Sequence, residues 1–199
     1  MTLLLASTSR YRAELLARLE VPFETAAPRF REEDSRHRFH ELPPADFALH
    51  LARAKAASLR DLHPEAWILA ADQIGVLSGD AGPVLLSKPG TEEAAVAQLL
   101  SMAGRSHELI TGVVLDPPNA EPPREIVDRH RLSMRAFGAE EARAYVARHR
   151  PLDCAGAYRI EDAGIRLFER IEGQDYTGII GLPLLAVAGL LREAGMLAR

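Results

Sequence analysis

Apolar and polar positions along the chain follow two different periods, and each change of period marks an expected element. Continuous apolar runs at Leu3–Ala6 and Trp67–Ala71 are typical of strands that are buried on both faces. The segment Pro44–Leu62 has an apolar stripe at helical spacing and a proline in its first turn, which favours a long helix. Strand-like segments on either side of PPNAEPP, Glu108–Leu115 and Arg124–Met134, indicate a β-hairpin.

The remaining segments complete an alternation of helices and strands. Helices are expected at Tyr11–Leu19, from Thr91 to about Gly104, at Ala139–His149 and at Leu182–Ala194; strands at Phe23–Ala26, Ile165–Ile171 and Tyr176–Ile180; and a charged loop at Arg29–His40. This alternation, with one antiparallel hairpin, predicts an α/β fold with a mixed twisted sheet flanked by helices. The proline-rich tip joins two strands and is no linker, so we expect one domain over residues 1–199.

Composition narrows the class of protein. The chain has 199 residues and is 47% hydrophobic, which suits a globular domain with a sizeable core. A net charge of −4 gives no basic field for nucleic acid or a membrane surface. No apolar run approaches the roughly 20 residues that span a bilayer. The N-terminus lacks signal-peptide features. The single cysteine, Cys154, fits a reducing compartment and is expected to be a small, buried hydrophobic residue. We therefore expect a soluble, cytoplasmic protein that binds neither nucleic acid nor membranes.

The N-terminal segment Leu3–Leu19 leads from a strand through a polar turn into a helix. The turn contains Ser7, Thr8 and Ser9, and Arg10 and Arg12 follow. Backbone N–H groups at a helix N-terminus attract anions, and hydroxyls and guanidinium groups add directed donors. The segment thus fits a phosphate cradle, but it equally fits an ordinary N-cap with solvated arginines.

Asp72 comes directly after the buried run ILAA and is followed by Gln73. Ligands of open α/β sheets bind beyond the carboxyl ends of strands, so an Asp at this rim suits a metal or a water. The alternative is a turn-forming Asp that bonds its own backbone. The buried character of the preceding strand favours the functional interpretation.

The other candidate residues are weak when each is taken alone. Lys88, in the SKPG turn, suits a phosphate contact, whereas Lys55 lies at the edge of an apolar stripe, and both are by default surface lysines. Glu32 belongs to an acidic group that is usually solvated, yet Mg²⁺ is held in proteins by one or two carboxylates together with substrate phosphates. Glu161 alone is a surface turn residue. The sequence has no P-loop, Rossmann glycine motif or nucleophile elbow. His37 and His40 have i, i+3 spacing but lack a third zinc ligand.

Six ordered motifs give these candidates a common context. LLLASTSRYRAELL resembles the LAS-x-S-P-R-R-x-ELL opening of the Maf family of nucleoside-triphosphate pyrophosphatases. ARAKA is similar to its A-x-x-KA helix, AADQ to its AD-[TQ] strand end, and SKPGTEEA to its GKP-x-x-x-x-A turn. DCAGAYRIE and IIGLPL are similar to its closing motifs. The resemblance covers nearly the whole chain. Arg10 stands where the family has Pro, and Ser87 where it has Gly.

The resemblance implies a fold shared with inosine-triphosphate pyrophosphatases. It also implies hydrolysis of a nucleoside triphosphate to the monophosphate and pyrophosphate with a divalent metal, Mg²⁺ or alternatively Mn²⁺. By motif position, Asp72 matches the proton acceptor, Ser9 and Arg12 match the phosphate-binding opening, and Glu32, Lys55 and Lys88 match the other catalytic positions. Glu32 and Asp72 are the expected metal ligands. The family also suggests a homodimer.

Three further positions distinguish two subfamilies. Tyr11, Gln73 and Glu161 resemble the Trp, Gln and Glu of the 7-methyl-GTP pyrophosphatases rather than the Arg, Thr and Gln of the dTTP/UTP enzymes. A carboxylate accepts hydrogen bonds from guanine N1–H and N2–H₂, and an aromatic face attracts a cationic methylated base. The alternatives are the dTTP/UTP activity and a nucleotide-binding regulator of septum formation with little turnover.

Overall fold

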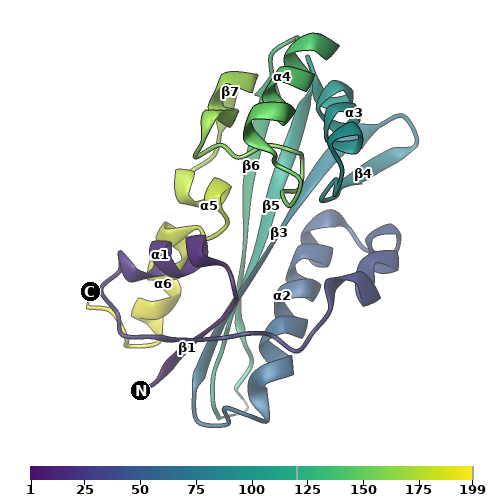
Figure 1. Cartoon of the computed structure of the whole chain (residues 1–199). Helices are drawn as coiled ribbons and strands as arrows, with labels where there is room; N and C mark the ends of the chain where they lie inside the picture. The colour runs from purple at the N-terminus through teal and green to yellow at the C-terminus, as the bar shows by residue number, and fades with distance from the viewer. Residues whose placement is uncertain (120, 199) are drawn as a thin grey trace. The chain divides into compact units, whose positions relative to one another are not determined.

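The computed structural model, which describes residues 1–119 and 121–198, is a mixed α/β structure (Figure 1). Its strands have the order β2-β1-β3-β5-β6-β7, and β4 pairs with β3 off this path. Tertiary contacts group the residues into two compact units: unit 1, with Met1–Gln73, Ile110–Asp128 and Asp175–Arg199, and unit 2, with Ile74–Leu109 and Arg129–Gln174. Three strands contribute residues to both units: β3 (Trp67–Gly79), β5 (Ser106–Asp116) and β6 (Arg124–Met134).

In unit 1, β1 (Leu3–Ala6) is the parallel neighbour of both β2 (Glu24–Ala26) and β3. The connection from β1 to β2 includes α1 (Arg10–Ala17), because parallel strands need a crossover rather than a tight turn. Strand β1 therefore delivers the polar turn after Ala6 to its own carboxyl end.

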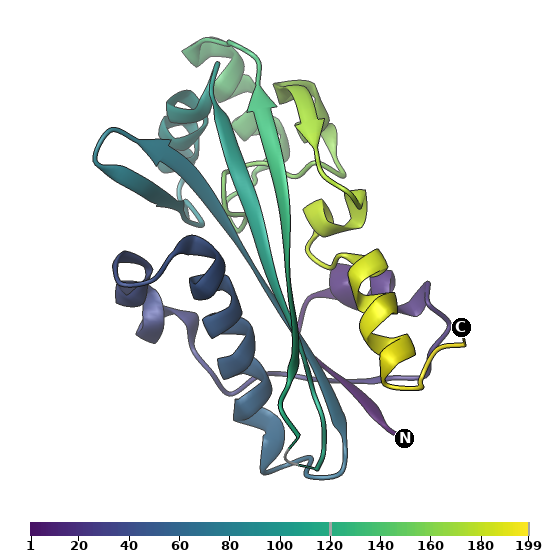
Figure 2. The same ribbon diagram turned by 180° about the vertical axis from the view of Figure 1, so that it is seen from behind.

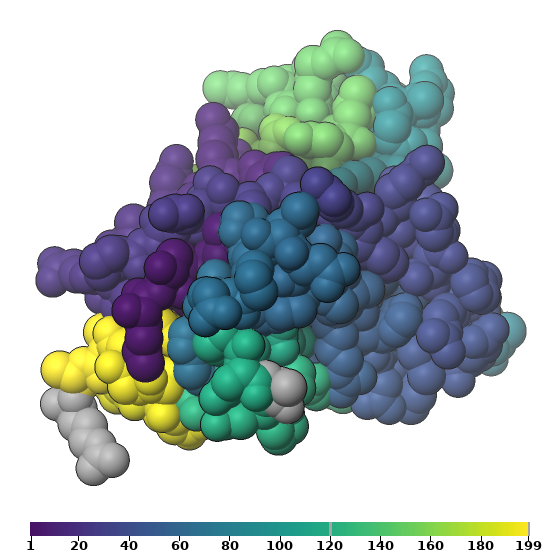
Figure 3. Space-filling view, turned by 90° about the horizontal axis from the view of Figure 1, so that it is seen from below, coloured from purple at the N-terminus to yellow at the C-terminus, as the bar shows by residue number. Residues whose placement is uncertain are grey.

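The alternation of β1 side chains builds a core on each face of the unit 1 sheet. Leu3 and Leu5 pack with α1 and α6 (Leu184–Glu193), whereas Leu4 and Ala6 pack with α2 (Pro44–Arg60). Figure 2 shows α2 and α6 on opposite sides of the strands. In Figure 3 the N-terminal residues lie beside the C-terminal helix, which agrees with their shared core.

Helix α2 packs directly against β5 at Gly112. A Cβ at Gly112 would lie 2.5 Å from the carbonyl carbon of Ala48, so only glycine permits this approach. The close packing holds the α2 face that carries Lys55 against the sheet.

Unit 2 contains two antiparallel strand pairs and a pair of packed helices. Strand β4 (Gly82–Leu86) is antiparallel to β3, and β7 (Phe168–Glu172) is antiparallel to β6. Helix α3 (Glu92–Met102), which Thr91 caps by accepting from Ala94 N at 3.2 Å, packs against α4 (Ala139–His149). A 3₁₀ helix, η2 (Ala163–Leu167), precedes β7.

The predicted α/β class, the long α2 helix and the two hairpin strands are confirmed; residue 120 of the hairpin tip lies outside the described residues. Several local predictions were wrong. Tyr176–Ile180 is the helix α5, because the Asp175 side chain caps it. The charged loop contains a 3₁₀ helix, η1 (Glu32–His40), and the last strand begins only at Phe168. Strand β4 was missed, since Gly82 and Pro83 obscure its pattern. One domain over residues 1–199 stays a prediction.

Within the described part of the chain, the helices are all too short or too polar to cross a membrane.

Candidate active site

Three of the predicted catalytic side chains meet in unit 1. The Lys55 ammonium donates to Glu32 Oε1 at 2.6 Å and to Asp72 Oδ1. Lys55 lies on the buried face of α2, Glu32 begins η1, and Asp72 lies in β3. We call these three residues the Lys55 cluster. Lys55 is 6% exposed, so the default of a surface lysine was wrong.

The prediction that Asp72 follows the end of its strand was also wrong. Strand β3 continues to Gly79, and Asp72 is only 3% exposed. The strand that ends close to Asp72 is the neighbouring strand β1. The parallel strand β1 ends at Ala6, its register places Leu5 opposite Leu69, and Asp72 lies three residues further on. Asp72 thus lies beyond the carboxyl end of β1, where open α/β sheets bind ligands.

Burial raises the pKa of the Asp72 carboxyl to about 6. The Lys55 ammonium opposes this shift, the Glu32 carboxylate adds to it, and the Arg12 guanidinium lowers the pKa again. Such a value lies close to neutrality, where a general base is most effective. Arg12 is therefore close enough to Asp72 to shift the pKa of its carboxyl.

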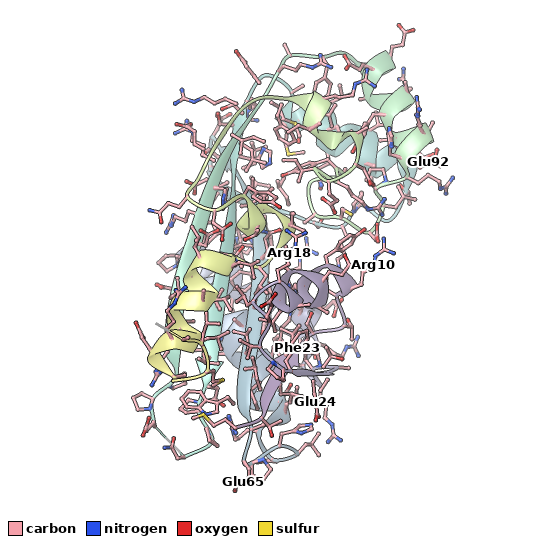
Figure 4. The ribbon with its side chains drawn as sticks, turned by 90° about the vertical axis from the view of Figure 1, so that its left-hand side faces the viewer. Arg10, Arg18, Phe23, Glu24, Glu65 and Glu92 are labelled. Carbon is pink, nitrogen blue, oxygen red and sulfur yellow. The ribbon has the colours of Figure 1, made fainter. Side chains whose placement is uncertain are left out.

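The turn after β1 is organised as an N-cap. Ser9 Oγ accepts from Arg12 N at 3.4 Å, and Ser7 Oγ accepts from Ser9 N at 3.1 Å. Arg12 Nε donates to Gly181 O at 3.0 Å. Figure 4 shows Arg10 at the start of α1 and Arg18 directly after its last turn. The N-cap alternative is confirmed for Ser9, and it leaves the phosphate role open because a capped helix start still presents N–H groups.

Tyr11 lies one residue into α1 and is partly exposed. Arg10 covers its ring at 4.8 Å from the centroid and donates to Tyr11 Oη at 2.9 Å.

Gln73 has a fixed amide orientation. Its Nε2 donates to Gly178 O at 2.6 Å and to Thr111 Oγ1 at 3.1 Å. A backbone carbonyl only accepts, so the amide nitrogen must face Gly178. Both N–H donors are then used within the protein, and the group that Gln73 can offer a ligand is its Oε1 acceptor.

Two predicted site residues, Lys88 and Glu161, belong to unit 2. Lys88 is exposed in the turn between β4 and α3, and Glu161 is exposed in the turn before η2. Cys154, also in unit 2, is partly buried, and burial raises the pKa of its thiol to about 11, which disfavours a nucleophilic role.

Two carboxylates of unit 1, Glu32 and Asp72, lie where they could share a metal ion. Among the described residues, no group of three or more His, Cys, Asp or Glu side chains could hold an ion. Glu32 and Asp72 nevertheless converge on the same ammonium, which fits an ion that takes one or two carboxylates and completes its shell with phosphate oxygens.

Sequence reasoning missed two polar residues near Arg12. Asp175 and Thr177 are 9% and 5% exposed, and Asp175 accepts from Thr177 Oγ1 at 2.7 Å. The D-x-T spacing was a usable signal, since Asp commonly bonds the backbone two residues further on.

Comparison with known proteins places the chain in a family. The family model described as Maf-like protein matches residues 2–194. The chain belongs to the Maf family. It is 40% identical over 194 residues to a 7-methyl-GTP pyrophosphatase of Syntrophotalea carbinolica, covering 98% of this chain and 95% of that protein. It is 42% identical over 193 residues to a 7-methyl-GTP pyrophosphatase of Xanthomonas oryzae pv. oryzae, covering 97% and 96%.

This Maf-family chain also has a distant likeness to a solved structure, that of the Staphylococcus aureus Ham1 protein. The TM-score is 0.44 at 14% identity, over 67% of this chain and 72% of that one. A likeness at this level supports no conclusion about the site.

Proposed function

We propose that this Maf-family chain hydrolyses a nucleoside triphosphate of the 7-methyl-GTP type to the monophosphate and pyrophosphate. The observation that carries the proposal is the Lys55 cluster, in which a buried carboxyl with a pKa of about 6 lies beside a buried ammonium and near Arg12. The two compared relatives carry the name 7-methyl-GTP pyrophosphatase, which supports the same activity.

In the proposed mechanism Asp72 is the general base. Its carboxylate takes a proton from water, and the water oxygen forms a bond to the α-phosphorus. The bond between the α-phosphorus and the bridging oxygen breaks, and pyrophosphate leaves with that electron pair. Arg12, Lys55 and Lys88 stabilise the charge on the phosphoryl oxygens, as phosphoryl transfer requires. The N–H groups at the Ser9-capped helix start add further donors.

Glu32 and Asp72 would hold the divalent cation, Mg²⁺ or alternatively Mn²⁺. When bound, the cation would neutralise phosphate charge. The Lys55 ammonium, which pairs with both carboxylates, would donate to phosphate oxygens.

The use of lysine in this chain supports the assignment of both phosphate contacts. Lysine occurs only at positions 55 and 88, whereas the other 22 of the 24 basic residues are arginine. An ammonium is a compact point charge that fits where a planar guanidinium does not. A chain that otherwise uses arginine has lysine at the two positions that match the catalytic motifs.

Base recognition is assigned to Tyr11, Gln73 and Glu161. The fixed Gln73 amide offers an acceptor, which matches the N1–H and N2–H₂ donors of guanine. A Glu161 carboxylate would accept from the same kind of edge and repel the O2 and O4 acceptors of uracil. The face of the Tyr11 ring that Arg10 does not cover would attract a cationic, methylated base.

A panel of triphosphates tests the proposal. The purified protein is incubated with Mg²⁺ and 7-methyl-GTP, GTP, UTP or dTTP, and the products are identified by ³¹P NMR. We expect monophosphate and pyrophosphate, highest kcat/KM for 7-methyl-GTP, and, in ¹⁸O-water, label in the monophosphate. Release of orthophosphate, or binding without turnover, would contradict the proposal. A preference for UTP or dTTP would assign the chain the dTTP/UTP activity instead.

We also propose that the protein is cytoplasmic and forms a homodimer. Light scattering of the purified protein tests the dimer.

A further inference from the structure

We propose that Asp175 and Thr177 form a side-chain clip that positions Arg12 for phosphate binding through the Gly181 carbonyl. Both are positioning residues that act on Arg12 and are not assigned to the substrate. The inference deepens the proposed function, because it rests on Arg12 binding a phosphate.

Two buried side chains form the clip with four hydrogen bonds. Asp175 Oδ1 accepts from Thr177 N at 3.0 Å and from Thr177 Oγ1 at 2.7 Å. Asp175 Oδ2 accepts from Leu185 N at 2.8 Å, and Thr177 Oγ1 accepts from Leu184 N at 2.9 Å. The two side chains therefore join the start of α5 to the first turn of α6.

The clip encloses the backbone of Gly181, which lies between the two helices. Gly181 has φ of 116°, a conformation that favours glycine, and it ends α5. Its N–H donates to Thr177 O at 3.2 Å and to Gly178 O at 3.1 Å. With α5 and α6 joined on either side, the Gly181 carbonyl has a defined direction.

That carbonyl accepts from Arg12 Nε at 3.0 Å. A guanidinium has five N–H donors in a rigid plane, and a bond at Nε fixes this plane while the four donors on the terminal nitrogens set the geometry for phosphate. Arg12 lies 169 residues from Gly181 in the sequence, so the position of its guanidinium depends on the α5–α6 turn.

Gln73 gives the turn a second attachment, because its amide donates to Gly178 O from strand β3. The α5–α6 turn is thus attached to β3, the strand that carries Asp72. Because Arg12 bonds the same turn, the clip fixes the position of the Arg12 guanidinium relative to β3.

A simple capping role is the competing explanation, and a double-mutant cycle separates the two. Thr177→Val keeps the shape of the side chain and removes the hydroxyl, whereas Thr177→Ser keeps the hydroxyl. Each is combined with Arg12→Ala, and the affinity for inorganic triphosphate is measured by titration calorimetry, with thermal unfolding recorded alongside.

We expect Thr177→Val to weaken triphosphate binding about tenfold, in the range for one hydrogen bond to a charged group, and Thr177→Ser to bind nearly as wild type. In the Arg12→Ala background, Thr177→Val should cause no further loss. Equal losses in both backgrounds would overturn the proposal, as would unchanged binding by Thr177→Val.

Asp175→Asn is the second variant if Thr177→Val does not fold, because the amide leaves Leu185 N–H facing a donor while keeping an acceptor for Thr177. It should show the same dependence on Arg12. Turnover separates the two proposals: coupled losses in a protein that hydrolyses no triphosphate refute the function alone, and independent losses in an active enzyme refute the clip alone. A wild type that does not bind triphosphate refutes the clip.

Discussion

Replacing Lys55 by methionine should destabilise the protein in a pH-dependent way. Methionine has a similar length and no charge, so Lys55→Met leaves the Asp72 carboxyl, 3% exposed, without its hydrogen-bonded cation. Breaking a buried pair by removing one partner costs about 3–5 kcal/mol.

The pH dependence follows from the pKa of Asp72. That pKa is about 6 with Lys55 present, and burial that is no longer opposed by the Lys55 ammonium raises a carboxyl pKa by up to about 3–5 units, to roughly 7–9. The pKa in the folded variant is thus about one to three units above the wild-type value. Each unit corresponds to about 1.36 kcal/mol. Because a raised folded pKa disfavours the charged form, the cost of the mutation should grow by about 1.4–4 kcal/mol as the pH rises through this window.

The free energy of unfolding is measured with urea, in EDTA, at about pH 5.5 and about pH 8.5. Lys88→Met is the matched control, since Lys88 is exposed and its replacement should change stability by no more than about 0.5 kcal/mol at either pH. Adding Asp72→Asn to Lys55→Met should abolish the pH dependence. A cost for Lys55→Met that is the same at both pH values would refute the interpretation of the Lys55 cluster.

Three further predictions concern catalysis. Glu32→Gln removes a charge that raises the pKa of Asp72, so the acidic limb of kcat/KM should move to lower pH than in the wild type; a limb that stays or rises contradicts the reasoning. Lys88→Ala should lower kcat/KM for every triphosphate tested, and a loss confined to one base would show that Lys88 does not contact the phosphates. Glu161→Gln should reduce the ratio of kcat/KM for 7-methyl-GTP to that for UTP by about ten- to a hundredfold, because a charged hydrogen bond is lost and a donor to a pyrimidine carbonyl is gained; an unchanged ratio places Glu161 away from the base.

Local patterns were enough to predict most of the elements. The run Leu3–Ala6 is apolar at every position and is a strand that is buried on both faces. Ser9 and Thr91 precede helices and cap them, as their hydroxyls favour. These features depend on neighbours in the sequence, so sequence reasoning reaches them.

Features that depend on distant residues were not predictable in the same way. In the sequence pattern Lys55 lies at the edge of an apolar stripe, and its burial depends on Asp72, 17 residues away, and on Glu32. Asp72 interrupts an apolar run without ending the strand, because Lys55 compensates its charge. Tyr176–Ile180 is short and has a β-like composition, but the Asp175 cap decides for a helix.

The most direct test of the account is the effect of Asp72→Asn on turnover and on binding. The amide keeps the shape of the carboxylate and cannot take a proton, so kcat for 7-methyl-GTP should fall by at least about 10²–10⁴-fold, the usual contribution of a positioned acid–base group. The dissociation constant for the same nucleotide, measured by calorimetry, should change far less than kcat. A purified, folded Asp72→Asn protein that releases pyrophosphate at nearly the wild-type rate would contradict the central claim.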